Sequence, residues 1–374
     1  MNKALSIFNS KRVILKIGSS LLINNEKFNY SWLESLIDDV LILKKKKIEI
    51  LIVASGAVSL GKKYLGIKKN KIKINEKQAC AACGQVILMN NFMKSFKKKN
   101  LKVAQLLLTF SDTENRKNSL NSRETITSLI DSEVIPIINE NDTVATEELK
   151  FGDNDRLASR VAQITNADSL ILLSDVIGLF NKNPKNNKNA KLINFVNFMT
   201  DDLKKISTHE TNSYGSGGMT TKIEAAEIAT NFGCNTLICS GKLKNPLKNY
   251  EKNRVGTWFF SEKKQVKGFK SWLAGSIKIS GSLIIDDGAF NAILKGASLL
   301  PSGVKKISGK FCRGDIIEIL HENGKKIGNG IIFYDSDEAK KIRGKKTSEI
   351  KDILGYLGRD EIVHRDNLTI NGKK

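Results

Sequence analysis

A chain of 374 residues, of which 40% are hydrophobic and 27% charged, is long enough for two domains with buried cores. No apolar run approaches the roughly 20 residues that a membrane-spanning helix requires. Residues 1–10 also lack the basic start and the long apolar stretch of a signal peptide. These features argue against a helical membrane protein, and we expect a cytoplasmic protein with no membrane partner.

The formal net charge of +22 raises the question of a polyanionic partner. The excess is mostly lysine, spread along the chain and often beside asparagine, as in residues 68–71 and 183–191. Arginine, which suits bidentate contacts with phosphates and bases, is scarce. We therefore interpret the charge as a solvated lysine surface, and leave a polyanion open as a partner for the C-terminal third only.

The chain contains five cysteines, an odd number that does not suggest a disulfide framework. Cys80 and Cys83 have the C-x-x-C spacing of a redox pair or of half a zinc site. No second Cys or His pair lies nearby in the sequence, and the flanking residues lead into an apolar, helix-like run. We interpret the two cysteines as small residues packed on a helix.

The first ~260 residues alternate apolar runs with amphipathic stretches. Residues 12–17 predict a buried strand, residues 32–44 a helix, and residues 48–53 a second strand. The same order recurs along the chain, with further strands predicted at residues 103–108, 134–138, 169–173 and 236–239. This alternation predicts an α/β fold, a mostly parallel open sheet sandwiched by helices, with ligands beyond the carboxyl ends of its strands.

Near residues 261–268 the pattern changes to a charged link, and after Gly275 the segments are shorter and β-like. Turn residues such as Asn323-Gly324 separate them, which is typical of hairpins. We therefore predict a first domain over residues 1–262 and a small β-rich domain with a C-terminal tail over residues 275–374.

A lysine lies inside the first predicted strand. Lys16 follows apolar residues and precedes a Gly18-Ser19-Ser20 turn. Because an ammonium group is costly to bury without a partner, Lys16 predicts a buried anion or carboxylate beside it. The alternative is an edge strand with this side chain in solvent.

Polar turns follow two other predicted strands. Ser55, in the turn at residues 54–57, offers a hydroxyl and backbone N–H donors to a carboxylate ligand, or forms only a tight turn. Residues 139–142 and 152–155 cluster amides and carboxylates. Such groups suit an α-amino ligand, and an acidic side chain can hold two lysines in place. The alternative is capping and turn formation, which Asn and Asp also favour.

Residues 214–222 form a glycine-rich turn that ends in Lys222 and leads into a predicted helix start at Ile223. Glycines let backbone N–H groups close on phosphate oxygens, and a helix N-terminus favours an anion. An ordinary surface loop is the alternative. With Ser174-Asp175 at another strand end, the turns predict phosphoryl transfer from a nucleotide to a small polar acceptor. The chain lacks the Walker A and protein-kinase motifs.

These segments resemble the amino acid kinase family. The matching pieces are residues 13–20 (VILKIGSS), 52–57 (IVASGA), 138–142 (INEND), 151–155 (FGDND), 173–180 (LSDVIGLF) and 215–222 (GSGGMTTK). Later segments resemble a PUA domain, a type found in RNA-modifying enzymes, at residues 283–289 (LIIDDGA), 296–304 (GASLLPSGV), 311–315 (FCRGD) and 361–368 (EIVHRDNL). The resemblance implies an amino acid kinase fold over residues 1–262 and a PUA-like domain over residues 275–374.

Within that family, the chain is most similar to kinases that phosphorylate the γ-carboxylate of L-glutamate with ATP and Mg²⁺, the first step of proline biosynthesis. The resemblance implies that Lys16 and Lys222 stabilise the transferring phosphoryl group and that Asp155 orients both lysines. The implied glutamate ligands are Ser55, Asn139, Asp142, Asp153 and Asn154. The implied ATP ligands are Lys16, Ser174, Asp175, Ser216, Gly217, Gly218, Met219, Thr220, Thr221 and Lys222. For Mg²⁺ we expect mainly phosphate and water oxygens and name no protein ligand.

The resemblance also implies a homo-oligomer, and channelling of the product to the next enzyme of the pathway is a further expectation. Two alternatives stay open. One is a related kinase for N-acetylglutamate, aspartate or a nucleotide monophosphate. The other is RNA binding by the C-terminal domain, which the charge favours. The C-terminal segment is, however, no richer than the rest in the aromatics that stack on the bases of single-stranded RNA.

Overall fold

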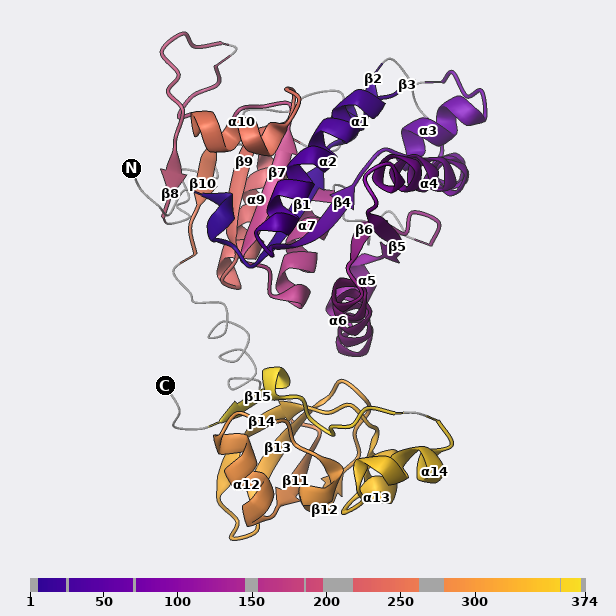
Figure 1. The fold of residues 1–374 in the computed structure, drawn as a ribbon, viewed down its shortest axis with the longest axis vertical. Coiled ribbons are helices and arrows are strands. Elements are labelled where there is room, and N and C mark those ends of the chain that lie inside the picture. The colour runs from indigo at the N-terminus through magenta and orange to yellow at the C-terminus, as the bar shows by residue number, and fades with distance from the viewer. Residues whose placement is uncertain are drawn as a thin grey trace. The chain divides into compact units, whose positions relative to one another are not determined.

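The computed structural model describes residues 6–24, 27–69, 72–144, 154–184, 186–197, 218–261, 279–356 and 358–370. The chain divides into two compact units, Met1–Gln265 and Val266–Lys374. Each unit has its own sheet, and Figure 1 shows the helices and strands of both.

Within the described residues, the first unit is built on an eight-stranded sheet with the order β5-β6-β4-β1-β7-β9-β10-β8. Its strands are β1 (Arg12–Ile17), β4 (Glu49–Ala54), β5 (Lys102–Leu108), β6 (Val134–Glu140), β7 (Ser169–Ser174), β8 (Phe195–Val196), β9 (Asn235–Ser240) and β10 (Thr257–Phe259). Neighbouring strands are parallel except for β9 and β10, which are antiparallel. The predicted mostly parallel sheet is confirmed. A separate pair, β2 (Ile23–Asn24) and β3 (Lys27–Phe28), is antiparallel.

Helices cover both faces of this sheet (Figure 1). They are α1 (Ser19–Leu22), α2 (Tyr30–Lys45), α3 (Ala57–Tyr64), α4 (Ile74–Lys97), α5 (Phe110–Glu114), α6 (Arg116–Asp131), α7 (Asn154–Thr165), α9 (Met219–Asn231), α10 (Pro246–Asn253) and the 3-10 helix η2 (Ile7–Asn9). The apolar side chains of α2, α3, α4 and α10 enter one core, and those of α6, α7 and α9 enter the other.

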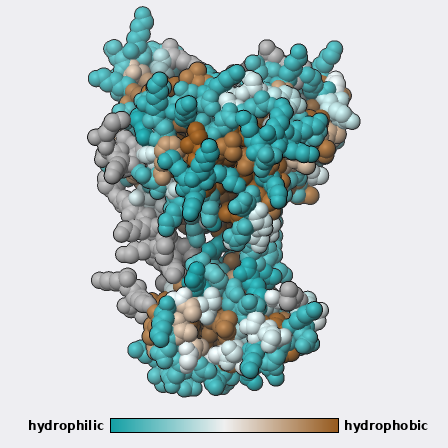
Figure 2. All heavy atoms as spheres, viewed as in Figure 1, coloured by the Kyte–Doolittle hydropathy of each residue, from teal (hydrophilic) through white to brown (hydrophobic). Residues whose placement is uncertain are grey.

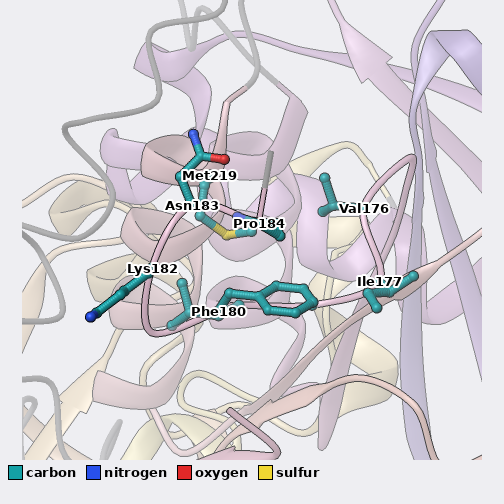
Figure 3. A pocket seen from close by; sticks show the side chains of 9 residues that line it. Val176, Ile177, Phe180, Lys182, Asn183, Pro184 and Met219 are labelled. Carbon is teal, nitrogen blue, oxygen red and sulfur yellow. The ribbon is translucent and has the colours of Figure 1, made fainter. Parts of the chain in front are cut away.

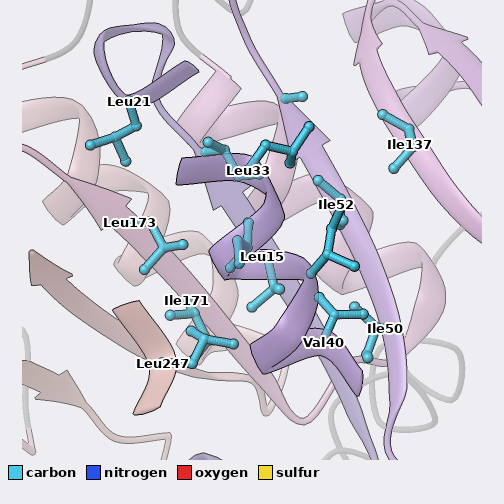
Figure 4. Close-up of a cluster of buried hydrophobic side chains, with 14 of the residues drawn as sticks. Leu15, Leu21, Leu33, Val40, Ile50, Ile52, Ile137, Ile171, Leu173 and Leu247 are labelled. Carbon is cyan, nitrogen blue, oxygen red and sulfur yellow. The ribbon is translucent and has the colours of Figure 1, made fainter. Parts of the chain in front are cut away.

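The two faces of β1 separate its side chains. Leu15 joins the core under α2 (Figure 4), whereas Ile14 joins the core under α7 and α9. Because successive side chains of a strand point to opposite faces, Lys16 lies on the same face as Ile14. The strand itself is central, flanked by β4 and β7. Lys16 is 5% exposed, which excludes the alternative of an edge strand with this side chain in solvent.

Helices α3 and α4 cross with their backbones in contact. A Cβ on Gly61 would lie 1.7 Å from the carbonyl oxygen of Cys80, and one on Gly84 would lie 1.8 Å from that of Ala57. Glycine is therefore required at both positions. Cys80 is buried in α4 and Cys83 is half-buried, and both are free thiols. Burial raises the pKa of the Cys80 thiol, so the structure fits small packed residues rather than reactive ones.

The second unit holds a sheet that, in the described residues, has five strands in the order β12-β11-β13-β14-β15. Its elements are β11 (Gly281–Ile285), α12 (Asp287–Leu294), η4 (Pro301–Gly303), β12 (Val304–Gly309), β13 (Ile316–His321), β14 (Lys326–Ile331), α13 (Ser336–Ile342), η5 (Thr347–Glu349), α14 (Ile350–Leu354), η6 (Arg365–Asn367) and β15 (Leu368–Ile370). Asn323-Gly324 joins β13 to β14, with Gly324 at a φ of +83°. The predicted β-rich second fold is confirmed.

The face of the protein in Figure 2 is largely hydrophilic, as expected for a surface rich in solvated lysine. Apolar side chains show through in patches of each unit. None of the helices in the described parts of the chain is long and apolar enough to cross a membrane.

Candidate active site

Three charged side chains meet on the α7 and α9 face of the first sheet. The Nζ atom of Lys16 lies 2.6 Å from Oδ1 of Asp155, and the Nζ atom of Lys222 lies 3.0 Å from Oδ2. The carboxylate is 0% exposed, and the two lysines are 5% and 6% exposed. Lys16 and Lys222, which are 139 and 67 positions from Asp155 in the sequence, are therefore brought to one point.

Each of these side chains comes from a different element. Lys16 is in β1, next to its carboxyl end, Asp155 is in the first turn of α7, and Lys222 is in the first turn of α9. The apolar faces of α7 and α9 pack in one core with Ile14 of β1, which sets the spacing of the three. The Thr221 hydroxyl also lies 3.3 Å from Oδ2 of Asp155.

The charge balance of this trio favours an anion. Two ammonium groups share one carboxylate, so the trio carries a net positive charge at a buried position. The N-termini of α7 and α9 add partial positive charge from their backbone N–H groups. An anion placed against the lysines would therefore be stabilised, and the Asp155 carboxylate between the lysines holds both ammonium groups in place.

The start of α9 differs from the sequence prediction. The helix begins at Met219, one turn before the predicted start at Ile223, with Gly218 as its N-cap in an extended conformation. Gly218 has no side chain to obstruct an approaching group, and the Thr221 hydroxyl donates to its carbonyl oxygen at 3.0 Å. Met219, Thr220, Thr221 and Lys222 are thus helical residues rather than loop residues. Ser216 and Gly217 lie outside the described residues.

Amide side chains lie beside the trio. Asn154, the first residue of α7, donates from Nδ2 to the carbonyl oxygen of Ala54 at 2.8 Å and to Oδ1 of Asn139 at 2.7 Å. Ser55 follows Ala54 directly at the end of β4, and its N–H donates to the carbonyl oxygen of Ile17 at 3.3 Å. The ends of β1, β4 and β6 therefore meet at one edge.

Two further residues, Asp142 and Asp153, are predicted ligands of the small substrate. Asp142 lies two residues beyond the end of β6 and is half-buried. Asp153 lies outside the described residues. The predicted substrate residues that the structure brings together are Ser55, Asn139 and Asn154.

A cavity of about 260 Å³ opens beside the start of α9 (Figure 3). Its walls are mainly apolar, with Val176, Phe180 and Met219 around it. The predicted nucleotide residues Ser174 and Asp175 directly precede this wall at the end of β7, and the Ser174 hydroxyl lies 3.1 Å from Oδ1 of Asp175. A mostly apolar pocket whose lining includes a few polar side chains, here Lys182 and Asn183, suits a nucleoside.

Of the nine residues that line this cavity, only Met219 was predicted from the sequence. The others are Val176, Ile177, Gly178, Leu179, Phe180, Lys182, Asn183 and Pro184. The signal for them is the apolar run after Ser174-Asp175 that a glycine interrupts. Gly178, which lies in this run and lines the cavity, has a φ of +155°. A residue with a side chain would be strained in that conformation.

No group of three or more His, Cys, Asp or Glu side chains with metal-binding geometry occurs among the described residues. Asp175 is the exposed carboxylate nearest in sequence to the cavity wall.

Comparison with known proteins places this architecture. Residues 11–240 match the amino acid kinase family, and residues 281–354 match the PUA domain. This chain belongs to the amino acid kinase family.

Relatives within the family share nearly the whole chain. Glutamate 5-kinase of Allorhizobium ampelinum is 42% identical over 98% of this chain and 93% of its own length. Glutamate 5-kinase of Bartonella henselae is 44% identical over 96% of this chain and 95% of its own length. Among solved structures, carbamate kinase from Giardia lamblia bound to AMP-PNP has a TM-score of 0.48 at 16% identity, and the match covers 68% of this chain and 100% of that one.

Proposed function

We propose that this protein transfers the γ-phosphoryl group of ATP to the γ-carboxylate of L-glutamate, which yields L-glutamyl 5-phosphate and ADP, the first step of proline biosynthesis. The observation that carries the chemistry is the buried trio in which Lys16 and Lys222 share Asp155. The choice of glutamate rests on near full-length similarity to chains named glutamate 5-kinase.

The reaction needs no covalent intermediate. The γ-carboxylate is already a nucleophile, so the protein mainly aligns two substrates and stabilises the charge on the phosphoryl group in the transition state of the transfer. Lys16 and Lys222 are suited to that role, because both ammonium groups are held at one point by Asp155. By analogy with a lost oxyanion donor, removal of either lysine costs about 2–4 kcal/mol of transition-state stabilisation.

ATP would enter with its base in the apolar cavity by Phe180 and its phosphates along the first turn of α9. Ser174 and Asp175, which directly precede Val176 of the cavity wall in the sequence, would offer polar contacts to the ribose or the phosphates. Gly218, Thr220, Thr221 and Lys222 would face the phosphates. Ser216 and Gly217, outside the described residues, stay further proposed ATP ligands. Mg²⁺ would be held mainly by phosphate and water oxygens, as is usual for this ion beside a nucleotide.

Glutamate would bind at the edge where β1, β4 and β6 end. Both amide protons of Asn154 are committed to Ala54 and Asn139, so this side chain presents its Oδ1 acceptor. An acceptor suits the α-ammonium group of an amino acid. The hydroxyl of Ser55 suits a carboxylate, and we propose Asp142 and Asp153 as further ligands of glutamate.

The domain assignment and the cellular setting extend this proposal. We assign catalysis to residues 1–262 and a PUA-like domain to residues 275–374. We also propose a cytoplasmic homo-oligomer with product channelling to the next enzyme of the pathway, on the basis of the family resemblance. RNA binding by the PUA-like domain is a separate hypothesis, which a salt-dependent shift of labelled RNA by the segment from Gly275 would support and the absence of a shift at low salt would overturn.

The test of the main proposal is ATP- and magnesium-dependent hydroxamate formation with L-glutamate, since hydroxylamine traps the acyl phosphate. Aspartate, N-acetylglutamate and UMP serve as parallel acceptors. We expect product with glutamate only, and its loss in Lys222→Ala. Turnover of another acceptor would keep the kinase chemistry and overturn the substrate. Absence of product with every acceptor, from folded protein, would overturn both.

A further inference from the structure

A chain of four amide side chains extends from the proposed glutamate pocket across the sheet to α4 and β5. Asn154 donates to Asn139 at 2.7 Å, and Nδ2 of Asn139 donates to Oε1 of Gln85 at 2.8 Å. Nε2 of Gln85 then donates to Oε1 of Gln105 at 3.3 Å. The first three lie on α7, β6 and α4, so the chain connects elements on different layers of the fold.

The direction of this chain is fixed by a backbone group. An amide side chain can turn its oxygen and nitrogen about, but the carbonyl oxygen of Ala54 can only accept a hydrogen bond. The atom of Asn154 that faces it must therefore be Nδ2. The same nitrogen faces Asn139, which must answer with Oδ1 and present Nδ2 to Gln85. The donor and acceptor atoms of every amide in this network are therefore assigned from that one carbonyl, and each further hydrogen bond helps to hold its amide in the assigned orientation.

Burial makes each link of the chain energetically significant. Asn154, Asn139 and Gln85 are 7%, 4% and 9% exposed. A buried amide without a partner forfeits its hydrogen bonds to water and receives none in return. Gln85 supplies the acceptor for the Nδ2 group of Asn139, and that pairing holds Asn139 in the orientation in which it accepts from Asn154.

We propose that Gln85 is a positioning residue for the amino acid substrate. By fixing Asn139, it keeps Asn154 oriented with its Oδ1 acceptor available to the α-ammonium group. This inference rests on the proposed function, because it assigns Gln85 a part in recognising that substrate. Gln85 acts through Asn139 and Asn154, and it is assigned no contact with the substrate or with the reacting atoms.

The test compares L-glutamate with glutarate, which carries the same γ-carboxylate and lacks the α-amino group. In Gln85→Leu, we expect KM for L-glutamate to rise about 10-fold or more, because Asn139 loses its buried acceptor. KM for ATP and kcat/KM for glutarate should stay close to their wild-type values. The preference for L-glutamate over glutarate in kcat/KM should therefore shrink by a similar factor.

Two variants separate positioning from stability. Gln85→Glu keeps an oxygen that accepts from Asn139, so it should retain most of the preference for L-glutamate. Asn91→Leu removes another buried amide of α4, which is not one of the four linked amides. The Oδ1 atom of Asn91 accepts from the Tyr30 hydroxyl at 2.7 Å. Asn91→Leu should lower the melting temperature and leave the preference unchanged. If Gln85→Leu does not fold, Gln85→Asn is the substitute, since it is one methylene too short to reach Asn139.

The outcomes are distinguishable from failure of the proposed function. Wild-type protein that does not phosphorylate L-glutamate would overturn the function itself, before any variant is compared. An active wild type, with Gln85→Leu losing activity equally on L-glutamate and glutarate, would overturn the positioning role. Loss of the preference in Gln85→Leu, with its retention in Gln85→Glu and Asn91→Leu, supports it.

Discussion

Asp155 is the residue on which the charge balance of the site depends. It is the one carboxylate of the trio, and it lies within 3.0 Å of both ammonium groups. We predict that Asp155→Asn lowers kcat for glutamate phosphorylation by about 100-fold or more, because a neutral amide cannot hold the two lysines together against their repulsion. The rate of hydroxamate formation at saturating ATP and glutamate measures the effect.

A matched control for this change is Asp39→Asn. Asp39 is 2% exposed in α2, and its Oδ2 accepts from the Leu247 N–H at 2.9 Å, at the start of α10. Burial raises the pKa of the Asp39 carboxyl, because desolvation disfavours its ionised form. Asp39→Asn should leave kcat unchanged. Equal losses in the two variants would contradict a specific role for Asp155.

A second consequence concerns stability. Removal of one partner from a buried ion pair typically costs about 3–5 kcal/mol, because the remaining charge is left buried. We predict that Asp155→Asn unfolds at a lower urea concentration than wild type. We also predict that ATP raises the free energy of unfolding more for Asp155→Asn than for wild type, since its phosphates supply the missing negative charge. Urea denaturation with and without ATP tests this, and an equal effect of ATP on both proteins would contradict it.

Single residues of the site differ in how far the sequence predicts them. Lys16 stands out because an ammonium group interrupts an apolar strand, and the prediction of a carboxylate beside it matches its ion pair with Asp155. Gln85 escapes prediction, since its partner Asn139 is 54 positions away and helix α4 gives no sign of which strand it covers. The roles of these residues in catalysis remain predictions.

At the scale of elements, the crossing of α3 and α4 links packing to the substrate pocket. Gly84 precedes Gln85, and a Cβ at Gly84 would lie 1.8 Å from the Ala57 carbonyl oxygen. We predict that Gly84→Ala separates the two helices and destabilises the protein by about 1–3 kcal/mol. It should also raise KM for L-glutamate, because Gln85 moves with α4. Urea denaturation and steady-state kinetics measure the two effects.

Gly288→Ala is the control for this substitution. Gly288 lies in α12, where an added Cβ would meet only Oδ1 of Asp286, at 3.4 Å. Since alanine favours a helix by about 1 kcal/mol over glycine, this variant should be neutral or slightly more stable. Unchanged stability of Gly84→Ala would show that α3 and α4 adjust easily to the added methyl group.

The elements themselves follow from the sequence where their periodicity is strong. The parallel strands near β1 are short apolar runs between amphipathic helices, and they were predictable for that reason. β10 is only three residues long and antiparallel to β9, so it carries no periodic signal of its own. The prediction that α9 starts at Ile223 is wrong by one turn. Thr220 and Thr221 are poor helix formers and did not indicate a helix, but the first turn of a helix tolerates them.

At the scale of the whole molecule, the described candidate site lies within one of the two compact units. Lys16, Asp155, Lys222 and the cavity by Phe180 all belong to Met1–Gln265, which has two hydrophobic cores of its own. A unit with its own core can fold alone. We therefore predict that a chain truncated after Gln265 folds and phosphorylates L-glutamate with a kcat/KM within about threefold of the full chain.

The decisive comparison measures folding and activity of the truncated chain together. Circular dichroism and a cooperative urea transition would establish that it is folded, and hydroxamate formation would report its chemistry. Ile319→Ala in the full chain is the complementary variant, because Ile319 is fully buried in β13 of the second unit. It should destabilise that unit by about 2–5 kcal/mol and leave kcat unchanged. A folded but inactive truncated chain would show that residues after Gln265 contribute to the site, and the assignment of catalysis to the first unit alone would then be wrong.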